Sequence, residues 1–407
     1  MPTTPAPIDI VLHDYSGHPF QAQLSRSLAR RGHTVTHVTS ADFQTPKGRL
    51  EPEDVGQGRL TILNLSLGQE FQKDTFIRRR AQEEAFGRLV GAHIERLRPA
   101  VVLSSNAPLD TQRGILKATR RAGAGFVFWV QDLYGEAIYR ILSDRLGQPG
   151  RAVGRYYRWL EHRMLRASDA AVVISEDFLP ILGRNNAMAP TTEVIENWAP
   201  LDEVAYLGPA PSRGGPVRLT YSGTLGYKHN PEVLSALAQL EGAEVAVYSE
   251  GRVAEELKRE AAPGARLQVS PWVPFDALPK TLADADILLA MIEADAGVFS
   301  VPSKVLTYLC AGRPVLASVP EENLARRILV GSGAGFVTPP GDIQGFLDNA
   351  RALIASPDLR ADMGRKGRAY AERMFDIESI TDRFERVLVA AATPRERVPA
   401  RDEGSSS

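Results

Sequence analysis

Two segments of the chain carry residue types suited to binding a phosphate. One is Tyr221–Asn230, YSGTLGYKHN, in which Gly223 permits close approach of the backbone to an anion and Lys228 adds a positive charge. The other begins at Ser303 and Lys304, which follow a proline and open an apolar stretch with helical spacing. The free N–H groups, hydroxyl and ammonium at such a helix start can bind a phosphate together.

Two further segments could move a proton or bind an anion. Residues 130–136, VQDLYGE, follow an apolar run typical of a buried strand, so Asp132 is the candidate base and Glu136 the second choice. The alternative is that Asp132 caps the following turn. The turn at Gly17 and His18 precedes a helical pattern, where it either binds an anion or caps the helix.

Short apolar runs alternate with helical patterns along most of the chain, which predicts parallel sheets covered by helices on both faces. Ligands of such sheets bind beyond the carboxyl ends of the strands, where all these segments are expected. The predicted strands are residues 8–12, 34–38, 60–65, 100–103, 126–130, 170–174, 217–221, 244–248, 266–269, 287–290, 314–317 and 335–337.

A cluster of proline, glycine and serine at 198–216 interrupts the alternation and indicates a linker. We therefore predict an α/β chain of two doubly wound Rossmann-like domains, 1–199 and 200–376, that face a cleft. The helical pattern at 377–392 is expected to pack back on the first domain. The polar, proline-containing residues 393–407 are expected to form a disordered tail.

The composition limits the function. The 407 residues include 48 basic and 49 acidic side chains, and this net charge of -1 does not favour nucleic acid as a partner. The single cysteine, Cys310, is expected to be a buried packing residue rather than a nucleophile. Asp284 and Asp286 fall at a helix end and a strand start, so we expect no metal site and no cofactor. Because no apolar run reaches ~20 residues and no signal-peptide pattern opens the chain, we expect a cytoplasmic protein.

Residues 151–166, RAVGRYYRWLEHRMLR, form an amphipathic helical pattern. Four arginines and His162 share one face, and Val153, Tyr157, Leu160 and Met164 share the opposite one. The pattern fits either an interfacial helix on an anionic membrane or a helix packed on its own sheet. Residues 1–200 carry a net charge of +4 and the remainder -5, which favours the first domain as the membrane side.

The chain resembles the retaining glycosyltransferases of family 4, which have the GT-B fold, and within them bacterial surface-polysaccharide transferases of the colanic-acid or fucosamine-transferase type. The resemblance covers about residues 8–392. It implies transfer of a sugar from a nucleoside-diphosphate donor, with a UDP-sugar favoured, to a lipid-linked or glycan acceptor at the inner face of the membrane. Seven blocks carry it in order: RRGHTVTHVTS, FVFWVQDLYGEA, VIENWAP, YSGTLGYKHN, WVPFDALPKTLADADILLA, VPSKVLTYLCAGRPVLA and GSGAGFVTPPGD.

The resemblance also assigns a donor site. Gly223, Thr224 and Lys228 match the family's glycine turn and basic residue at the donor diphosphate. Ser303 and Lys304 match the phosphate-facing start of a helix. No metal is required, because the helix start and the lysines can stabilise the departing diphosphate.

Other positions depart from the family pattern or match it less closely. Glu250 lies where many relatives have a glycine-rich turn near the sugar nucleotide, and Val273 matches a segment that contacts the base. Most relatives carry two glutamates where this chain has Phe299 and Thr307, so recognition of the ribose or sugar must differ. Thr307 could supply a hydroxyl instead. Asp132 lies where relatives place a polar residue near the anomeric carbon.

Two alternatives to a transferase remain open at this point. A catalytically inactive GT-B scaffold or binding subunit is favoured by the missing glutamate pair, and a sugar-nucleotide epimerase would share the same fold. An oxidoreductase is disfavoured, because the chain has no GxGxxG after its first strand.

Overall fold

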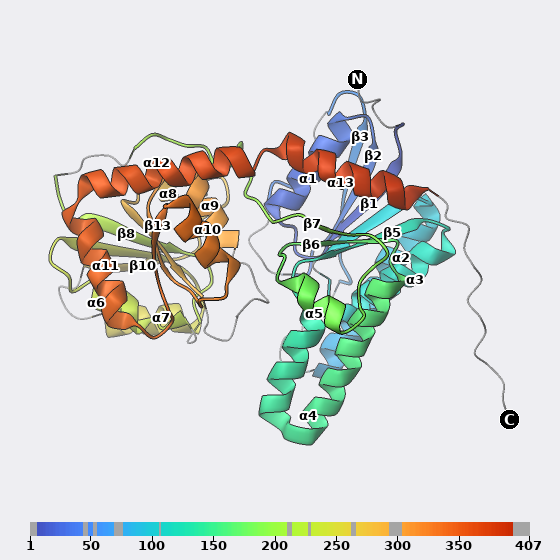
Figure 1. Ribbon diagram of the computed structural model, residues 1–407, viewed down its shortest axis with the longest axis horizontal. Coiled ribbons are helices and arrows are strands. Elements are labelled where there is room, and N and C mark those ends of the chain that lie inside the picture. Colours follow the sequence, from blue (N-terminus) through green and yellow to red (C-terminus); the bar gives the residue numbers. More distant parts are fainter. Residues whose placement is uncertain are drawn as a thin grey trace.

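A computed structural model describes residues 6–43, 48–51, 55–68, 76–105, 107–209, 214–226, 229–261, 266–292 and 303–393. It shows two parallel sheets, each covered by helices on both faces (Figure 1). The predicted fold class, two Rossmann-like α/β domains, is thereby confirmed.

The N-terminal sheet has the strand order β3-β2-β1-β4-β5-β6-β7, with every neighbouring pair parallel. Its central strands are buried on both faces, which is why they are apolar runs rather than alternating patterns. The strands are β1 Asp9–Asp14, β2 Thr34–Ser40, β3 Arg59–Leu65, β4 Val101–Ser105, β5 Gly125–Val130, β6 Ala170–Val173 and β7 Thr192–Val194. The helices are α1 Pro19–Arg30, α2 Phe76–Leu97, α3 Leu109–Arg121, α4 Tyr134–Ala167 and α5 Phe178–Arg184.

The C-terminal sheet has the order β10-β9-β8-β11-β12-β13 and is also parallel throughout. Its strands are β8 Val217–Ser222, β9 Ala243–Tyr248, β10 Leu267–Ser270, β11 Ile287–Met291, β12 Val315–Ser318 and β13 Gly335–Thr338. The helices are α6 Glu232–Leu237, α7 Arg252–Glu260, α8 Leu278–Ala283, α9 Ser303–Cys310, α10 Leu324–Ser332, α11 Ile343–Ala355 and α12 Pro357–Met374. Successive side chains of β11 enter different cores: Ile287 and Leu289 pack with α6 and α11, whereas Leu288 packs with α9 and α10.

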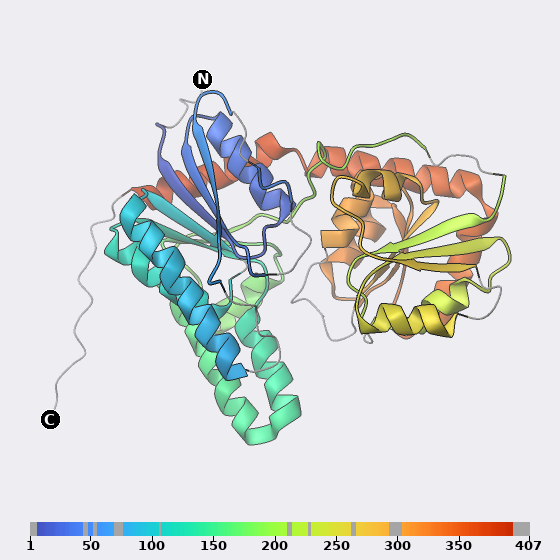
Figure 2. The same ribbon diagram turned by 180° about the vertical axis from the view of Figure 1, so that it is seen from behind.

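The last helix, α13 (Ile377–Ala392), returns to the N-terminal domain and lies along it (Figures 1 and 2). Phe384 is fully buried, with its ring 4.6 Å from that of Trp129 and 6.0 Å from that of Trp198 between centroids. Arg31 forms ion pairs with α13, at 2.7 Å to Glu378 and 2.8 Å to Glu385. The chain therefore crosses twice between the domains.

The structure lengthens the helical pattern that the sequence shows at 151–166. That segment is the second arm of α4, a helical hairpin that projects from the domain (Figures 1 and 2). Tyr157, Leu160 and Met164 are only 5%, 3% and 2% exposed, because they pack on their own domain. For these three residues the packing interpretation is therefore the right one, and no membrane contact can involve them.

Cys310 is fully buried, and its Sγ lies 3.9 Å from the carbonyl oxygen of Ala199. Burial raises the pKa of the thiol to about 12, so the side chain stays neutral and acts in packing. The predicted tail is described only at residue 393; residues 394–407 lie outside the described part of the chain.

Candidate functional site

Lys304 extends from the first turn of α9 over the turn that follows β8. Its Nζ lies 3.7 Å from the centroid of the Tyr221 ring. Gly223 has a φ of 129°, and a Cβ added there would lie 3.2 Å from the same Nζ. The turn therefore needs glycine for two reasons: its backbone conformation disfavours L side chains, and the lysine occupies the space of a side chain. Two segments predicted to bind phosphate thus meet in the structure.

The ammonium of Lys304 is poorly solvated. Burial lowers the pKa of Lys304 to about 7, because the charged form loses hydration. No carboxylate of the described residues forms an ion pair with it. Hydrogen bonds between Tyr308 and the backbone of Ser222, at 3.1 and 3.3 Å, fix α9 against β8. A desolvated cation at a helix N-terminus without an anion of its own is suited to an anionic ligand.

Two neighbouring loops at the same edge of the sheet are joined to each other. Glu250 follows β9, and its carboxylate accepts a hydrogen bond of 3.2 Å from the backbone N–H of Trp272, which follows β10. Val273 is the next residue, so Glu250 and Val273 lie on adjoining loops. Because β9 lies parallel between β8 and β10, these loops share the carboxyl edge of the sheet with Gly223.

The remaining donor-site residues differ in what the structure says of them. The carbonyl oxygen of Thr224 accepts a hydrogen bond of 2.6 Å from the Tyr221 hydroxyl, which holds the turn. Ser303 is exposed, and its carbonyl accepts a 3.2 Å hydrogen bond from the hydroxyl of Thr307, one turn into α9. Lys228, the other predicted cation of this site, lies outside the described residues.

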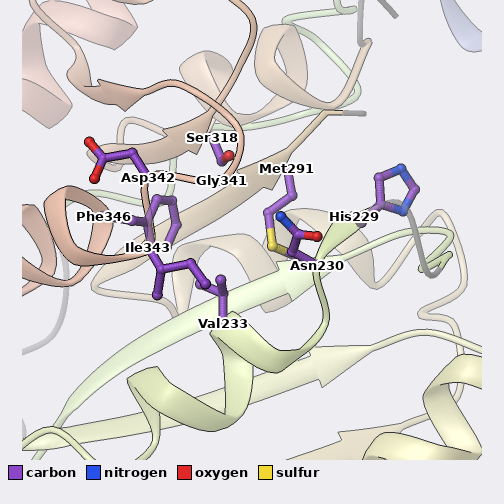
Figure 3. A pocket seen from close by; sticks show the side chains of 9 residues that line it. All are labelled: His229, Asn230, Val233, Met291, Ser318, Gly341, Asp342, Ile343 and Phe346. Atoms are coloured by element: carbon purple, nitrogen blue, oxygen red, sulfur yellow. The ribbon is translucent and has the colours of Figure 1, made fainter. Parts of the chain in front are cut away.

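A small pocket opens between the start of α6 and the start of α11 (Figure 3). The pocket is open to solvent, and much of its lining is apolar, including Val233, Met291 and Phe346. His229 and Asn230 reach it from the same loop as Gly223. The segment YSGTLGYKHN is therefore divided: Gly223 lies against Lys304 of α9, and His229 and Asn230 line this pocket. None of the predicted donor-site residues that the structure describes lines this pocket.

Asp132 lies at the carboxyl edge of the other sheet, directly after β5. It is half-buried, and burial raises the pKa of its carboxyl to about 6. The preceding residue, Gln131, is held by Asn197, whose Nδ2 donates a hydrogen bond of 2.6 Å to the Gln131 Oε1. Asn197 belongs to the segment that enters the linker, so the link between the domains also supports the loop that carries Asp132. A carboxylate with this pKa can accept a proton near neutral pH.

Glu161 supports the same loop and was not predicted as a site residue. Its carboxylate comes from the returning arm of α4 and accepts a hydrogen bond of 3.1 Å from the N–H of Gly135. Glu161 is fully buried, and burial raises its pKa to about 8. The sequence held one signal: Glu161 lies four residues after Tyr157 and three before Met164, on the buried face of the helix.

Glu136, the second candidate base, is engaged by the returning arm of α4. Its carboxylate oxygens lie 3.7 Å from Arg158 and 3.7 Å from His162. These contacts favour a role in joining the two arms of the hairpin.

The turn at Gly17 and His18 has its N–H groups already occupied. The carboxylate of Asp14 accepts hydrogen bonds from the backbone N–H of His18 and, at 3.1 Å, from that of Ser16. Asp14 is fully buried, and burial raises the pKa of its carboxyl. Of the two interpretations of this turn, these hydrogen bonds favour the capped turn over the anion site.

Among the described residues, no group of three or more His, Cys, Asp or Glu side chains is arranged to hold a metal ion. No helix in the described part of the chain is both long enough and apolar enough to cross a bilayer.

Comparison with known families assigns both halves of the chain. The model of the glycosyl transferase 4-like domain matches residues 18–198, and the model of the glycosyl transferases group 1 matches residues 217–356. A probable glycosyltransferase of Pseudomonas aeruginosa, WbjE, is 26% identical over 204 residues, covering 45% of this chain and 51% of WbjE. The chain thus aligns with about half the length of that curated relative.

Solved structures share the arrangement of both domains. Sucrose-phosphate synthase of Thermosynechococcus elongatus has a TM-score of 0.73 at 16% identity, covering 93% of this chain and 98% of its own. HepE of Anabaena, solved in complex with UDP-glucose, has a TM-score of 0.63 at 13% identity, covering 94% and 99%. At such low identity these likenesses show the fold. Together, the two domain matches and the paired parallel sheets show that the chain belongs to the GT-B glycosyltransferases, with a family 4-like N-terminal domain.

Proposed function

We propose that the protein transfers a glycosyl unit from a nucleoside-diphosphate sugar, with UDP as the favoured nucleotide, to a lipid-linked or glycan acceptor in the synthesis of a surface polysaccharide. We further propose that the anomeric configuration is retained and that the protein acts at the inner face of the membrane. No metal ion or other cofactor is part of the proposal.

One observation carries it: the desolvated Lys304 at the start of α9, held against Gly223 and the Tyr221 ring. A departing nucleoside diphosphate needs positive charge that is already in place, and a cation with little hydration to lose supplies it at low cost in reorganisation. The structures of HepE were solved with UDP and with UDP-glucose, which supports the choice of nucleotide.

Within this proposal each side of the protein has a role. The diphosphate binds at Gly223 and Lys304, with Lys228 as a second cation. The nucleoside lies toward the loops of Glu250 and Val273. Asp132 on the opposite domain orients or deprotonates the acceptor hydroxyl, since its carboxyl is ionised above a pH of about 6.

Isothermal titration of UDP, GDP and ADP into the wild type and Lys304→Met tests the donor site. Methionine keeps the length of the stem and removes the charge. We expect UDP to bind most tightly and Lys304→Met to weaken it about 10- to 100-fold, the usual range for a charge-assisted hydrogen bond. The matched control is Lys258→Met, an exposed lysine on α7. Equal UDP affinity in all three proteins would show that Lys304 does not bind the diphosphate.

The two alternatives are separated by their products. A scaffold binds UDP, but it does not cleave any UDP-sugar to UDP, whether or not an acceptor is present. An epimerase changes the sugar of the UDP-sugar without an acceptor. NMR of the reaction mixture distinguishes these from a transferase, and the coupling constant of the new anomeric proton reports retention or inversion.

A further inference from the structure

The hairpin of α4 projects from the N-terminal domain at the carboxyl edge of its sheet (Figures 1 and 2). Gly147, with a φ of 60°, and Pro149 break the helix at its outer end. The first arm starts at Tyr134, two residues after Asp132, and reaches Leu146 after about 18 Å of helix. The outer end of the hairpin therefore stands clear of the core, whereas its first arm begins beside the candidate base Asp132.

Large apolar side chains on this hairpin are exposed. Leu146 at the tip is 60% exposed, Ile141 on the first arm 46% and Val153 on the second arm 37%. Trp159 is 47% exposed, and the guanidinium of Arg163 lies 5.2 Å from its ring centroid. Exposed apolar residues that are scattered singly need no explanation, but four on one projecting element indicate a surface that a partner covers.

The same surface is basic. Residues 140–159 contain five arginines and one aspartate, a net charge of +4, in a chain whose total is -1. Arg145, Arg151 and Arg155 are exposed, and none of them forms an ion pair with a carboxylate of the described residues. Exposed leucine, isoleucine and tryptophan surrounded by arginine match the two components of an anionic bilayer surface, its acyl boundary and its phosphates.

We propose that the outer end of α4, residues 140–159, docks on an anionic phospholipid bilayer. Leu146 and Ile141 enter the headgroup region, and the arginines contact lipid phosphates. Docking of the hairpin extends the proposed function and rests on it only where a lipid-linked acceptor is assigned. A docked hairpin holds Asp132 within about 20 Å of the bilayer, on the side where such an acceptor arrives.

Vesicle co-sedimentation tests the charge component, with the full-length protein and without donor or acceptor, so that it can fail independently of transferase activity. The wild type should sediment with phosphatidylcholine vesicles containing about 30% phosphatidylglycerol at about 0.1 M NaCl, and not with pure phosphatidylcholine. Replacing Arg145, Arg151 and Arg155 together by Glu should lower the partition coefficient at least about 100-fold. The matched control reverses three exposed arginines of the other domain: Arg252, Arg351 and Arg365.

The apolar component is tested by Leu146→Asp, which should weaken sedimentation at least about tenfold. The matched control is Val330→Asp on α10, where the side chain is 57% exposed and lies on the other domain. The proposal is wrong if the wild type stays in the supernatant with the anionic vesicles, or if a hairpin variant and its control bind equally.

A third variant, Leu146→Trp, reports where the contact lies. Its emission should shift to shorter wavelength with the anionic vesicles, and brominated lipid should quench it. Sedimentation without any shift would place the contact elsewhere and overturn the proposal. A wild type that ignores vesicles and forms a dimer in light scattering, with Leu146→Asp monomeric, would show instead that the hairpin joins two copies of the chain.

Discussion

Binding of UDP should depend on pH through Lys304. Burial lowers the pKa of this lysine from its usual 10.5 to about 7 in the free protein, and a bound diphosphate restores the charged form. With a pKa of about 7, roughly nine tenths of the side chains are protonated at a pH of about 6 and roughly one tenth at a pH of about 8. Because the diphosphate binds the protonated form, the contribution of Lys304 to the association constant should fall about tenfold over this range.

Lys304→Arg is the matched reference, because arginine stays protonated over the whole range. UDP itself loses a phosphate proton in this range, but that change affects both proteins equally. Isothermal titration should therefore show the ratio of wild-type to Lys304→Arg affinity falling about tenfold between a pH of about 6 and about 8. In buffers of different ionisation enthalpy, the wild type should take up close to one proton per UDP near a pH of about 8. A constant ratio with no proton uptake refutes the reasoning, since it would mean that Lys304 is already charged or does not contact UDP.

Four further outcomes are expected. Asp132→Asn should lower turnover about 10²- to 10⁴-fold while UDP affinity stays the same, and full activity in the variant excludes Asp132 as the base. In the wild type, kcat/KM should fall as the pH drops through about 6, because the Asp132 carboxylate becomes protonated. Gly223→Ala should weaken UDP binding by displacing Lys304, whereas Gly123→Ala, with a φ of 76° and no neighbour within 4 Å, should affect only stability. The pKa of Glu161 is about 8 in the folded protein and about 4.5 in the unfolded chain. As the pH rises from about 4.5 to about 8, the free energy of unfolding of the wild type should therefore fall relative to that of Glu161→Gln, as measured by urea titration. Phe384→Ala should lower the free energy of unfolding by about 3–5 kcal/mol, against less than about 0.5 kcal/mol for the exposed Val330→Ala.

Local patterns in the sequence determined the fold class. Each strand of the two sheets except β7 could be predicted, because a strand buried on both faces must be a short apolar run, and a helix beside it must show an apolar stripe. Position relative to these strands then predicted where Gly223, Lys304 and Asp132 would lie. The short strand β7 was missed, since so few residues carry no clear periodicity.

Only the tertiary structure decided which of these residues meet and in what charge state. The contact between Gly223 and Lys304 joins residues 81 positions apart, and the same burial lowers the lysine pKa. Glu161 supports the loop of Asp132 only because α4 turns back at Gly147. Asp14 occupies the N–H groups of a turn that by spacing alone could have bound an anion. Periodicity reports which face of an element is buried, whereas hydration and hydrogen-bond partners depend on segments brought together from distant parts of the chain.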